Sequence, residues 1–146
     1  MNPDRTIQIL LVEDNPGDIY LMTSELKNMS LPTKLHVVVD GEEAINFLQK
    51  KGTYENVQRP DMIILDLNLP RIDGREVLAC IKADSTLANI PLIIVSASDE
   101  DKDILNEYHP HLNVFIKKPD SLTSFQLLIE QIKKFMQKNL ASSTKG

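Results

Sequence analysis

Five apolar stretches recur along the chain, and each is as long as a typical β-strand. They are rich in isoleucine, leucine and valine and lie at residues 7–12, 34–39, 61–66, 91–96 and 113–117. Most of them are continuously apolar and do not alternate with polar residues, which is typical of strands buried on both faces of a parallel sheet. We therefore expect parallel strands with helices on both sides.

The segments between these stretches place apolar residues three or four positions apart, as one face of a helix does. This spacing predicts helices around residues 19–29, 44–48, 77–81, 104–108 and 125–136. Strand and helix thus alternate five times, which is typical of a doubly wound α/β fold, and the common order for five strands is the flavodoxin-like 2-1-3-4-5. No repeat or linker divides the chain, so we expect a single domain over residues 1–146, with a core at about 7–138 and a polar tail at 139–146.

The composition excludes several classes of function. A net charge of −5 argues against binding to nucleic acid, which requires clustered lysine and arginine. No apolar run approaches the roughly 20 residues of a membrane helix, and the first residues lack the basic and apolar segments of a secretory signal. A lone cysteine, Cys80, fits a reducing compartment. We expect a cytoplasmic protein that binds neither nucleic acid nor a membrane.

Carboxylates follow two strands that we expect to be neighbours. Glu13 and Asp14 come directly after the first strand, and Asp66 ends the third. In the predicted order these residues meet where the strand order reverses, at the carboxyl edge of the sheet, which is where ligands of such folds bind. Two unit charges about 4 Å apart repel by about 4 kcal/mol at an effective dielectric of about 20, so a group of carboxylates favours a cation. Oxygen ligands suit Mg²⁺.

A structural role explains part of this pattern. Glu13 and Asp14 also suit the start of a helix, and Asp66 taken alone could be a turn residue. Capping gives no reason, however, for the third strand to end in a carboxylate as well. The convergence of the acids on one edge is what favours a functional site.

A hydroxyl and a lysine lie at the same predicted edge. Ser96 ends the fourth strand, and Lys118 follows the fifth, directly before a proline. Phosphoryl transfer to a carboxylate requires such a set: the carboxylate attacks phosphorus, a metal ion and a lysine hold the negative charge, and the hydroxyl donates to a phosphoryl oxygen. Lysine before proline is also a common way to leave a strand, so the interpretation rests on the whole set.

Motifs along the chain resemble the receiver domain of two-component response regulators, from Ile7 to about Lys138. "ILLVEDNP" resembles its acidic pair, "IILDLNLPRIDG" its phosphoacceptor segment, "IIVSAS" its hydroxyl segment and "VFIKKP" its lysine-proline segment. Residues 47–78 also resemble stand-alone, chemotaxis-regulator-like receivers paired with phytochrome-type or hybrid sensor kinases.

The resemblance implies a role for each residue of the acidic edge. Asp66 would be the phosphoacceptor. It would also bind Mg²⁺ together with Asp14, with the backbone carbonyl of Asn68 and, through a water molecule, with Glu13.

The resemblance implies further roles on the fourth and fifth strands. Lys118 would bind the phosphoryl group, Ser96 would be the switch hydroxyl and Phe115 the switch aromatic. A cis peptide before Pro119 is implied as well.

The implied function is that of a stand-alone response regulator, which is a phosphoacceptor and not an enzyme. It would take a phosphoryl group from a sensor histidine kinase or a phosphotransfer protein onto Asp66, in a reaction that needs Mg²⁺, and lose it by slow hydrolysis. Its output would be phosphorylation-dependent contacts with other proteins, including a homodimer formed through the fourth helix, the fifth strand and the fifth helix.

Other functions share parts of this pattern. A pseudo-receiver would use the same fold only as an interaction module, and the complete set of acids, hydroxyl and lysine argues against it. An aspartyl-phosphate phosphatase of the haloacid dehalogenase type would have a second acid two positions after Asp66, where Asn68 stands. A flavodoxin-like redox carrier would have a loop rich in Ser, Thr and Gly after the first strand, whereas the acidic "EDNPGD" would repel a flavin phosphate.

Overall fold

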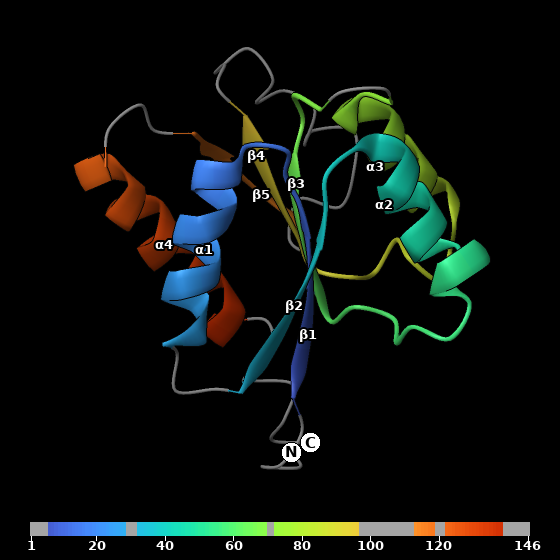
Figure 1. The fold of residues 1–146 in the computed structure, drawn as a ribbon, viewed down its shortest axis with the longest axis horizontal. Helices are drawn as coiled ribbons and strands as arrows, with labels where there is room; N and C mark the ends of the chain where they lie inside the picture. The colour runs from blue at the N-terminus through green and yellow to red at the C-terminus, as the bar shows by residue number, and fades with distance from the viewer. Residues whose placement is uncertain (1–5, 29–31, 70–71, 97–112, 119–121, 139–146) are drawn as a thin grey trace.

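The computed structural model describes residues 6–28, 32–69, 72–96, 113–118 and 122–138. Within them a five-stranded sheet lies between two layers of helices (Figure 1). The strands are β1 (Ile7–Val12), β2 (Thr33–Val38), β3 (Met62–Asp66), β4 (Leu92–Ser96) and β5 (Asn113–Lys117). The helices are α1 (Pro16–Lys27), α2 (Gly41–Leu48), α3 (Gly74–Ala83) and α4 (Leu122–Met136), with a short 3-10 helix at Gly52–Tyr54.

The strand order is β2-β1-β3-β4-β5, and all neighbouring strands are parallel, which confirms the predicted fold. Every residue of β1, β3 and β4 is buried, whereas β2 lies at the edge of the sheet and is largely exposed or half-buried. This difference explains the sequence pattern. The interior strands are nearly all apolar, while β2 includes Lys34 and His36.

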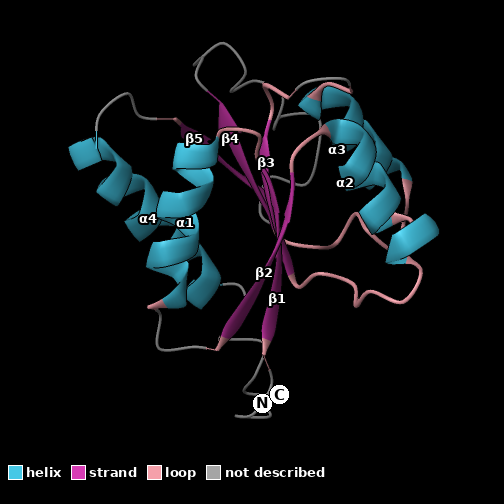
Figure 2. Cartoon of the chain, viewed as in Figure 1, coloured by secondary structure: helices cyan, strands magenta, loops and turns pink. Residues whose placement is uncertain are grey.

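Helices α1 and α4 cover one face of the sheet, and α2 and α3 cover the other (Figure 2). Met22 of α1 and Ile132 of α4 pack in one hydrophobic cluster with Leu11 of β1. Leu78 of α3 packs in a second cluster with Leu10 of β1. Successive residues of β1 therefore face different helix layers, which is why almost every position of this strand is apolar.

Each predicted element that the structure describes is present, with boundaries that differ by up to three residues. The second strand lies one residue earlier than predicted, and the third and fourth strands begin one residue later. The four described helices each begin three residues before the predicted range, and the last of them is α4. The helix predicted at 104–108 and the peptide before Pro119 lie outside the described residues. None of the described helices is long and apolar enough to span a membrane.

Capping side chains fix where the first three helices begin. Asn15 caps α1, Asp40 caps α2 and Asp73 caps α3, each by accepting a hydrogen bond from a backbone N–H of the first turn. The bonds are 3.1, 2.8 and 2.8 Å long. Such caps satisfy N–H groups that have no partner within the helix. The caps therefore fix where the chain passes from β1 into α1 and from β2 into α2.

Gly74 allows α3 to begin directly against the end of β3. A Cβ atom at this position would lie 2.5 Å from Cα of Leu67 and 2.6 Å from the backbone oxygen of Asp66. Gly41 allows a similar approach, because a Cβ atom there would overlap the backbone carbonyl of Ile72. The described parts of the loop after Asp66 are thus packed against the starts of α2 and α3.

Candidate functional site

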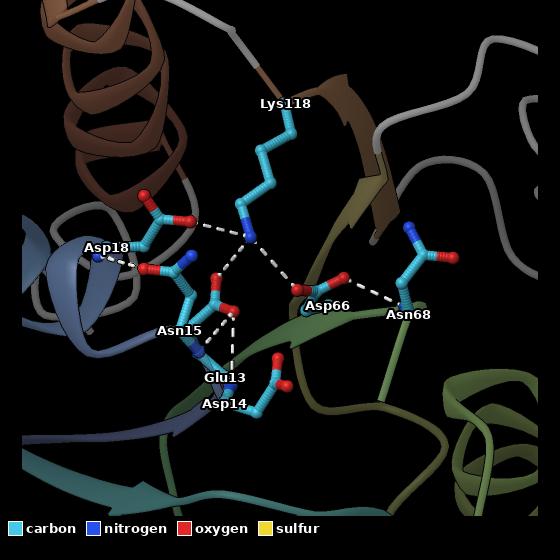
Figure 3. A network of polar contacts seen from close by, with 7 residues as sticks. All are labelled: Glu13, Asp14, Asn15, Asp18, Asp66, Asn68 and Lys118. Atoms are coloured by element: carbon cyan, nitrogen blue, oxygen red, sulfur yellow. Dashed lines mark hydrogen bonds and ion pairs between the residues drawn. The ribbon is translucent and has the colours of Figure 1, made fainter. Parts of the chain in front are cut away.

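Charged side chains from three strands meet at the carboxyl edge of the sheet (Figure 3). Glu13 follows β1 directly, Asp66 is the last residue of β3, and Lys118 follows β5 directly. Glu13 and Asp66 are only 1% and 3% exposed. Burying a charge is costly unless a partner compensates it, so this site has to contain its own counter-charge.

The ammonium group of Lys118 supplies that counter-charge. Its Nζ lies 2.9 Å from Oε1 of Glu13, 3.1 Å from Oδ2 of Asp66 and 2.7 Å from Oδ2 of Asp18. Burial acts to lower the pKa of Lys118, but the hydrogen bonds to Asp18 and Glu13 outweigh it and raise the pKa above its usual value. Lys118 is therefore protonated at neutral pH and donates to three carboxylates.

Glu13 is oriented by the turn that follows β1. Its Oε2 accepts hydrogen bonds from the backbone N–H groups of Asp14 and Asn15, at 3.1 and 3.3 Å. The pKa of Glu13 is raised to about 7, first by burial and then by the neighbouring Asp66, while Lys118 acts in the opposite direction. Near neutral pH a fraction of the metal-free molecules therefore holds a proton on Glu13.

Asp66 has a partner on each carboxylate oxygen. Oδ1 accepts a hydrogen bond of 2.8 Å from the backbone N–H of Asn68, and Oδ2 accepts one of 3.1 Å from Lys118. The first bond is that of an aspartate in a turn. Asp66 therefore does stabilise a turn, as the sequence allowed. It also belongs to the charged cluster that it forms with Glu13 and Lys118.

Glu13, Asp14 and Asp66 have the geometry to hold a metal ion together. One carboxylate oxygen of each residue lies within 4.8 Å of the other two. Asp14 is exposed, whereas Glu13 and Asp66 are buried, so the cluster is open to solvent on the Asp14 side. Hard oxygen donors with a net negative charge fit a divalent cation such as Mg²⁺ or Mn²⁺.

Ser96 and Phe115 lie on strands beside the charged cluster. Ser96 is fully buried at the end of β4, and its backbone oxygen accepts a hydrogen bond of 2.6 Å from the N–H of Lys118. Phe115 of β5 is partly buried and packs against the hydrophobic cluster under α2 and α3. Ser96 thus lies at the predicted edge, and the switch roles of both residues stay predictions.

The structure brings together the predicted acids and Lys118, and it assigns the cap of α1 to Asn15. The side chain that caps this helix is therefore that of Asn15 and not that of Glu13 or Asp14. Sequence reasoning missed Asp18. An acid in the first turn of a helix is common, because it interacts favourably with the helix dipole, and only its place four residues after Asp14 could have indicated a position near the cluster.

A known family covers most of the chain. The response regulator receiver domain matches residues 9–133. The chain belongs to this receiver family. The prediction of a receiver domain is therefore confirmed, and so is the fold that this resemblance implied.

Individual receivers support the same conclusion. Response regulator Rcp1 of Synechocystis sp. is 40% identical over 134 residues, which cover 92% of this chain and 90% of Rcp1. The crystal structure of the phosphorylated cyanobacterial phytochrome response regulator RcpA is 42% identical, with a TM-score of 0.82, and the match covers 94% of this chain and 96% of RcpA. The Mn(2+)-bound form of Rcp1 is 38% identical with a TM-score of 0.78, over 90% of this chain and 92% of Rcp1. The predicted likeness to phytochrome-associated receivers is thus confirmed.

We predict that Glu13→Gln changes how the stability of this receiver depends on pH. The pKa of Glu13 is about 7 in the folded protein, against an ordinary value of 4.5. The folded state binds this proton more tightly, so the stabilisation from Glu13 is complete below the ordinary pKa and is lost as pH rises through about 7. In metal-free buffer, wild type should lose about 1 to 3 kcal/mol relative to Glu13→Gln between about pH 5 and pH 8. Urea unfolding at each pH measures this difference.

Glu130→Gln is the matched control, because Glu130 is an exposed acid on α4. Its unfolding free energy should follow the pH profile of wild type. A profile of Glu13→Gln that also runs parallel to wild type would contradict the raised pKa of Glu13.

Proposed function

We propose that this receiver is a stand-alone response regulator that accepts a phosphoryl group on Asp66 from a sensor histidine kinase or a phosphotransfer protein. The observation that carries the proposal is the buried carboxylate of Asp66, placed between the N–H of Asn68 and the ammonium of Lys118. Support comes also from RcpA, which is described in a phosphorylated form and which this chain covers over 96% of its length.

In the proposed reaction a carboxylate oxygen of Asp66 forms a bond to phosphorus while the bond from phosphorus to the donor's histidine nitrogen breaks. The electron pair of the broken bond stays on the imidazole, which takes up a proton. Lys118, already 3.1 Å from Asp66, holds the negative charge of the transferred group. The acyl phosphate is later hydrolysed slowly, so the protein is a phosphoacceptor with weak self-dephosphorylation.

The proposed cofactor is Mg²⁺ at the acidic cluster. Asp14, Asp66 and the backbone carbonyl of Asn68 would bind it directly, and Glu13 through a water molecule. When bound, the cation neutralises the charge that develops on the phosphoryl oxygens. Support comes from the carboxylate oxygens of the cluster, which lie within 4.8 Å of one another, and from Mn²⁺ in the form of Rcp1 described above.

We predict that acetyl phosphate adds one phosphoryl group to wild type, and that it does so only when a divalent cation is present. Asp66→Asn should stay unmodified, because an amide is a far weaker nucleophile than a carboxylate. Intact-mass spectrometry before and after incubation measures the product. Asp84→Asn, which changes an aspartate after the far end of α3, should be phosphorylated as wild type is.

A phosphoryl group on Ser96 or on a histidine, or one that persists in Asp66→Asn, would contradict the assignment of the phosphoacceptor. A wild type that neither acetyl phosphate nor a histidine kinase modifies would favour the alternative of a pseudo-receiver, which acts only as an interaction module.

We predict that millimolar Mg²⁺ raises the melting temperature of wild type, since a cation that binds only the folded state stabilises it by mass action. At a concentration of about 100 times Kd the gain is about 2.7 kcal/mol. Asp14→Ala should lose most of the gain, whereas Glu130→Ala should keep it. Thermal unfolding with and without Mg²⁺ checks both, and full stabilisation of Asp14→Ala would rule out the proposed ligands.

The proposed output is a change in the protein's own surface. The hydroxyl of Ser96 would bond a phosphoryl oxygen on Asp66, and the half-buried ring of Phe115 would then move deeper beside β4. The surface affected comprises the helix predicted at 104–108, β5 and α4, and it would form a homodimer or bind a partner. Ser96 ends β4, which pairs with β3 and with β5, so the strand is suited to connect Asp66 with Phe115.

We predict that beryllofluoride, which mimics a phosphoryl group, changes self-association or kinase affinity of wild type by about 5-fold to 150-fold, the usual range of such coupling. Ser96→Ala should lose most of this change because it lacks the hydroxyl. Ser85→Ala, a change at an exposed serine, is the control. Sedimentation velocity measures self-association and titration calorimetry measures kinase affinity, each with and without beryllofluoride. Wild-type values that are equal in both states for both measurements would contradict the switch.

A further inference from the structure

Asp18 touches the charged cluster but has none of the roles proposed so far. Its Oδ2 lies 2.7 Å from Nζ of Lys118, which is the shortest of the three ion pairs of this ammonium group. The side chain of Asp18 is 21% exposed, against 1% for Glu13 and 4% for Asp66. Figure 3 shows Asp18 and Asp66 on opposite sides of Nζ. Asp18 therefore contacts Lys118 from the solvent side of the cluster.

The start of α1 fixes the position of Asp18. The backbone N–H of Asp18 donates to Oδ1 of Asn15 at 3.1 Å, and Pro16 occupies the first helical position. Both features define the backbone of the first turn. Exposed ion pairs usually contribute little, because two long side chains lose freedom. Asp18 has a short side chain on a backbone that the start of α1 holds in place, so it loses little freedom in the ion pair. The side chain of Lys118 is also only 17% exposed.

A count of donors shows why this contact matters. An ammonium group has three N–H donors, and among the described residues three carboxylates lie within 3.1 Å of Nζ of Lys118. Two of its partners, Glu13 and Asp66, also belong to the cluster suited to a metal ion, whereas Asp18 does not. A divalent cation bound at that cluster would compete with Lys118 for the same carboxylates and would repel it. Of the three partners of Lys118, Asp18 is the one that lies outside the cluster.

We propose that Asp18 is a positioning residue that retains the Lys118 ammonium beside Asp66 while a divalent cation occupies the acidic cluster. The proposal deepens the proposed function and rests on its metal site. It has two consequences. Without the charge of Asp18, Lys118 stays bound to Glu13 and Asp66 and competes more strongly with the cation. Once the cation is bound, Lys118 is also held less firmly in the position where it would bind the phosphoryl group.

The test is a calorimetric titration of the metal-free protein with Mg²⁺, in the absence of any phosphodonor. Asp18→Asn preserves shape and removes the charge, and we expect Mg²⁺ affinity to fall about threefold to tenfold, as for two groups that share a partner. Asp18→Glu restores the carboxylate and should recover most of the affinity. Glu25→Gln removes an acid from the same helix, at 4.0 Å from Lys133, and should match wild type.

A double-mutant cycle separates action through Lys118 from a general effect of charge. In a Lys118→Met background, Asp18→Asn should change Mg²⁺ affinity by less than about twofold, because no ammonium is left to compete. Lys118→Gln provides a second background if the methionine variant does not fold. The phosphorylation rate of Asp18→Asn at saturating Mg²⁺ should fall also, since Lys118 is less well placed.

Equal losses of Mg²⁺ affinity from Asp18→Asn with and without Lys118 would overturn the proposal, because Asp18 would then act only as one more negative charge. An affinity of Asp18→Asn equal to that of Glu25→Gln, or a wild type that binds no Mg²⁺, would overturn it too. A wild type that binds Mg²⁺ but is not phosphorylated on Asp66 would contradict the proposed function alone, and the calorimetric cycle would still decide the role of Asp18.

Discussion

The ammonium group of Lys118 and the carboxylates around it form the interaction on which this end of the molecule depends. Lys118 and Glu13 are 105 positions apart in the chain and 2.9 Å apart in space. One positive charge facing three acids leaves the cluster negative even before Asp14 is counted. A buried group of this kind is stable only with a proton or a further cation. The raised pKa of Glu13 favours a bound proton, and the arrangement of Glu13, Asp14 and Asp66 suits a bound cation.

The sheet explains how such distant residues meet. Because β1 and β3 are parallel neighbours, their final residues lie at the same edge. Strand β5 is two positions from β3, which is about 10 Å at the usual strand spacing. The long side chain of Lys118 reaches across the end of β4 to Asp66, and β4 ends there in the small Ser96. Packing on both faces of the sheet keeps these strand ends in register.

The sequence was sufficient for the strands and the acids at their ends, because each follows from a local pattern, and the strand order follows from the alternation of strands and helices, for which one order is common. Continuous apolar stretches predict buried parallel strands, and the order of such strands then places Glu13, Asp14 and Asp66 together. Asp18 could not be found in this way. Its contact with Lys118 depends on how α1 begins at Asn15 and on where that first turn lies relative to β5, which are properties of the packed molecule. The turn bond of Asp66 likewise shows that a structural and a functional role can coexist in one residue.

Anomalous diffraction from crystals soaked in Mn²⁺ tests most directly whether these acids form a cation site. We predict one strong peak at the carboxyl edge of the sheet, within direct coordination distance of Asp14 and Asp66, with the Lys118 ammonium displaced toward Asp18. A peak elsewhere on the surface, or an acidic cluster without a peak at saturating Mn²⁺ and with Lys118 unmoved, would contradict it.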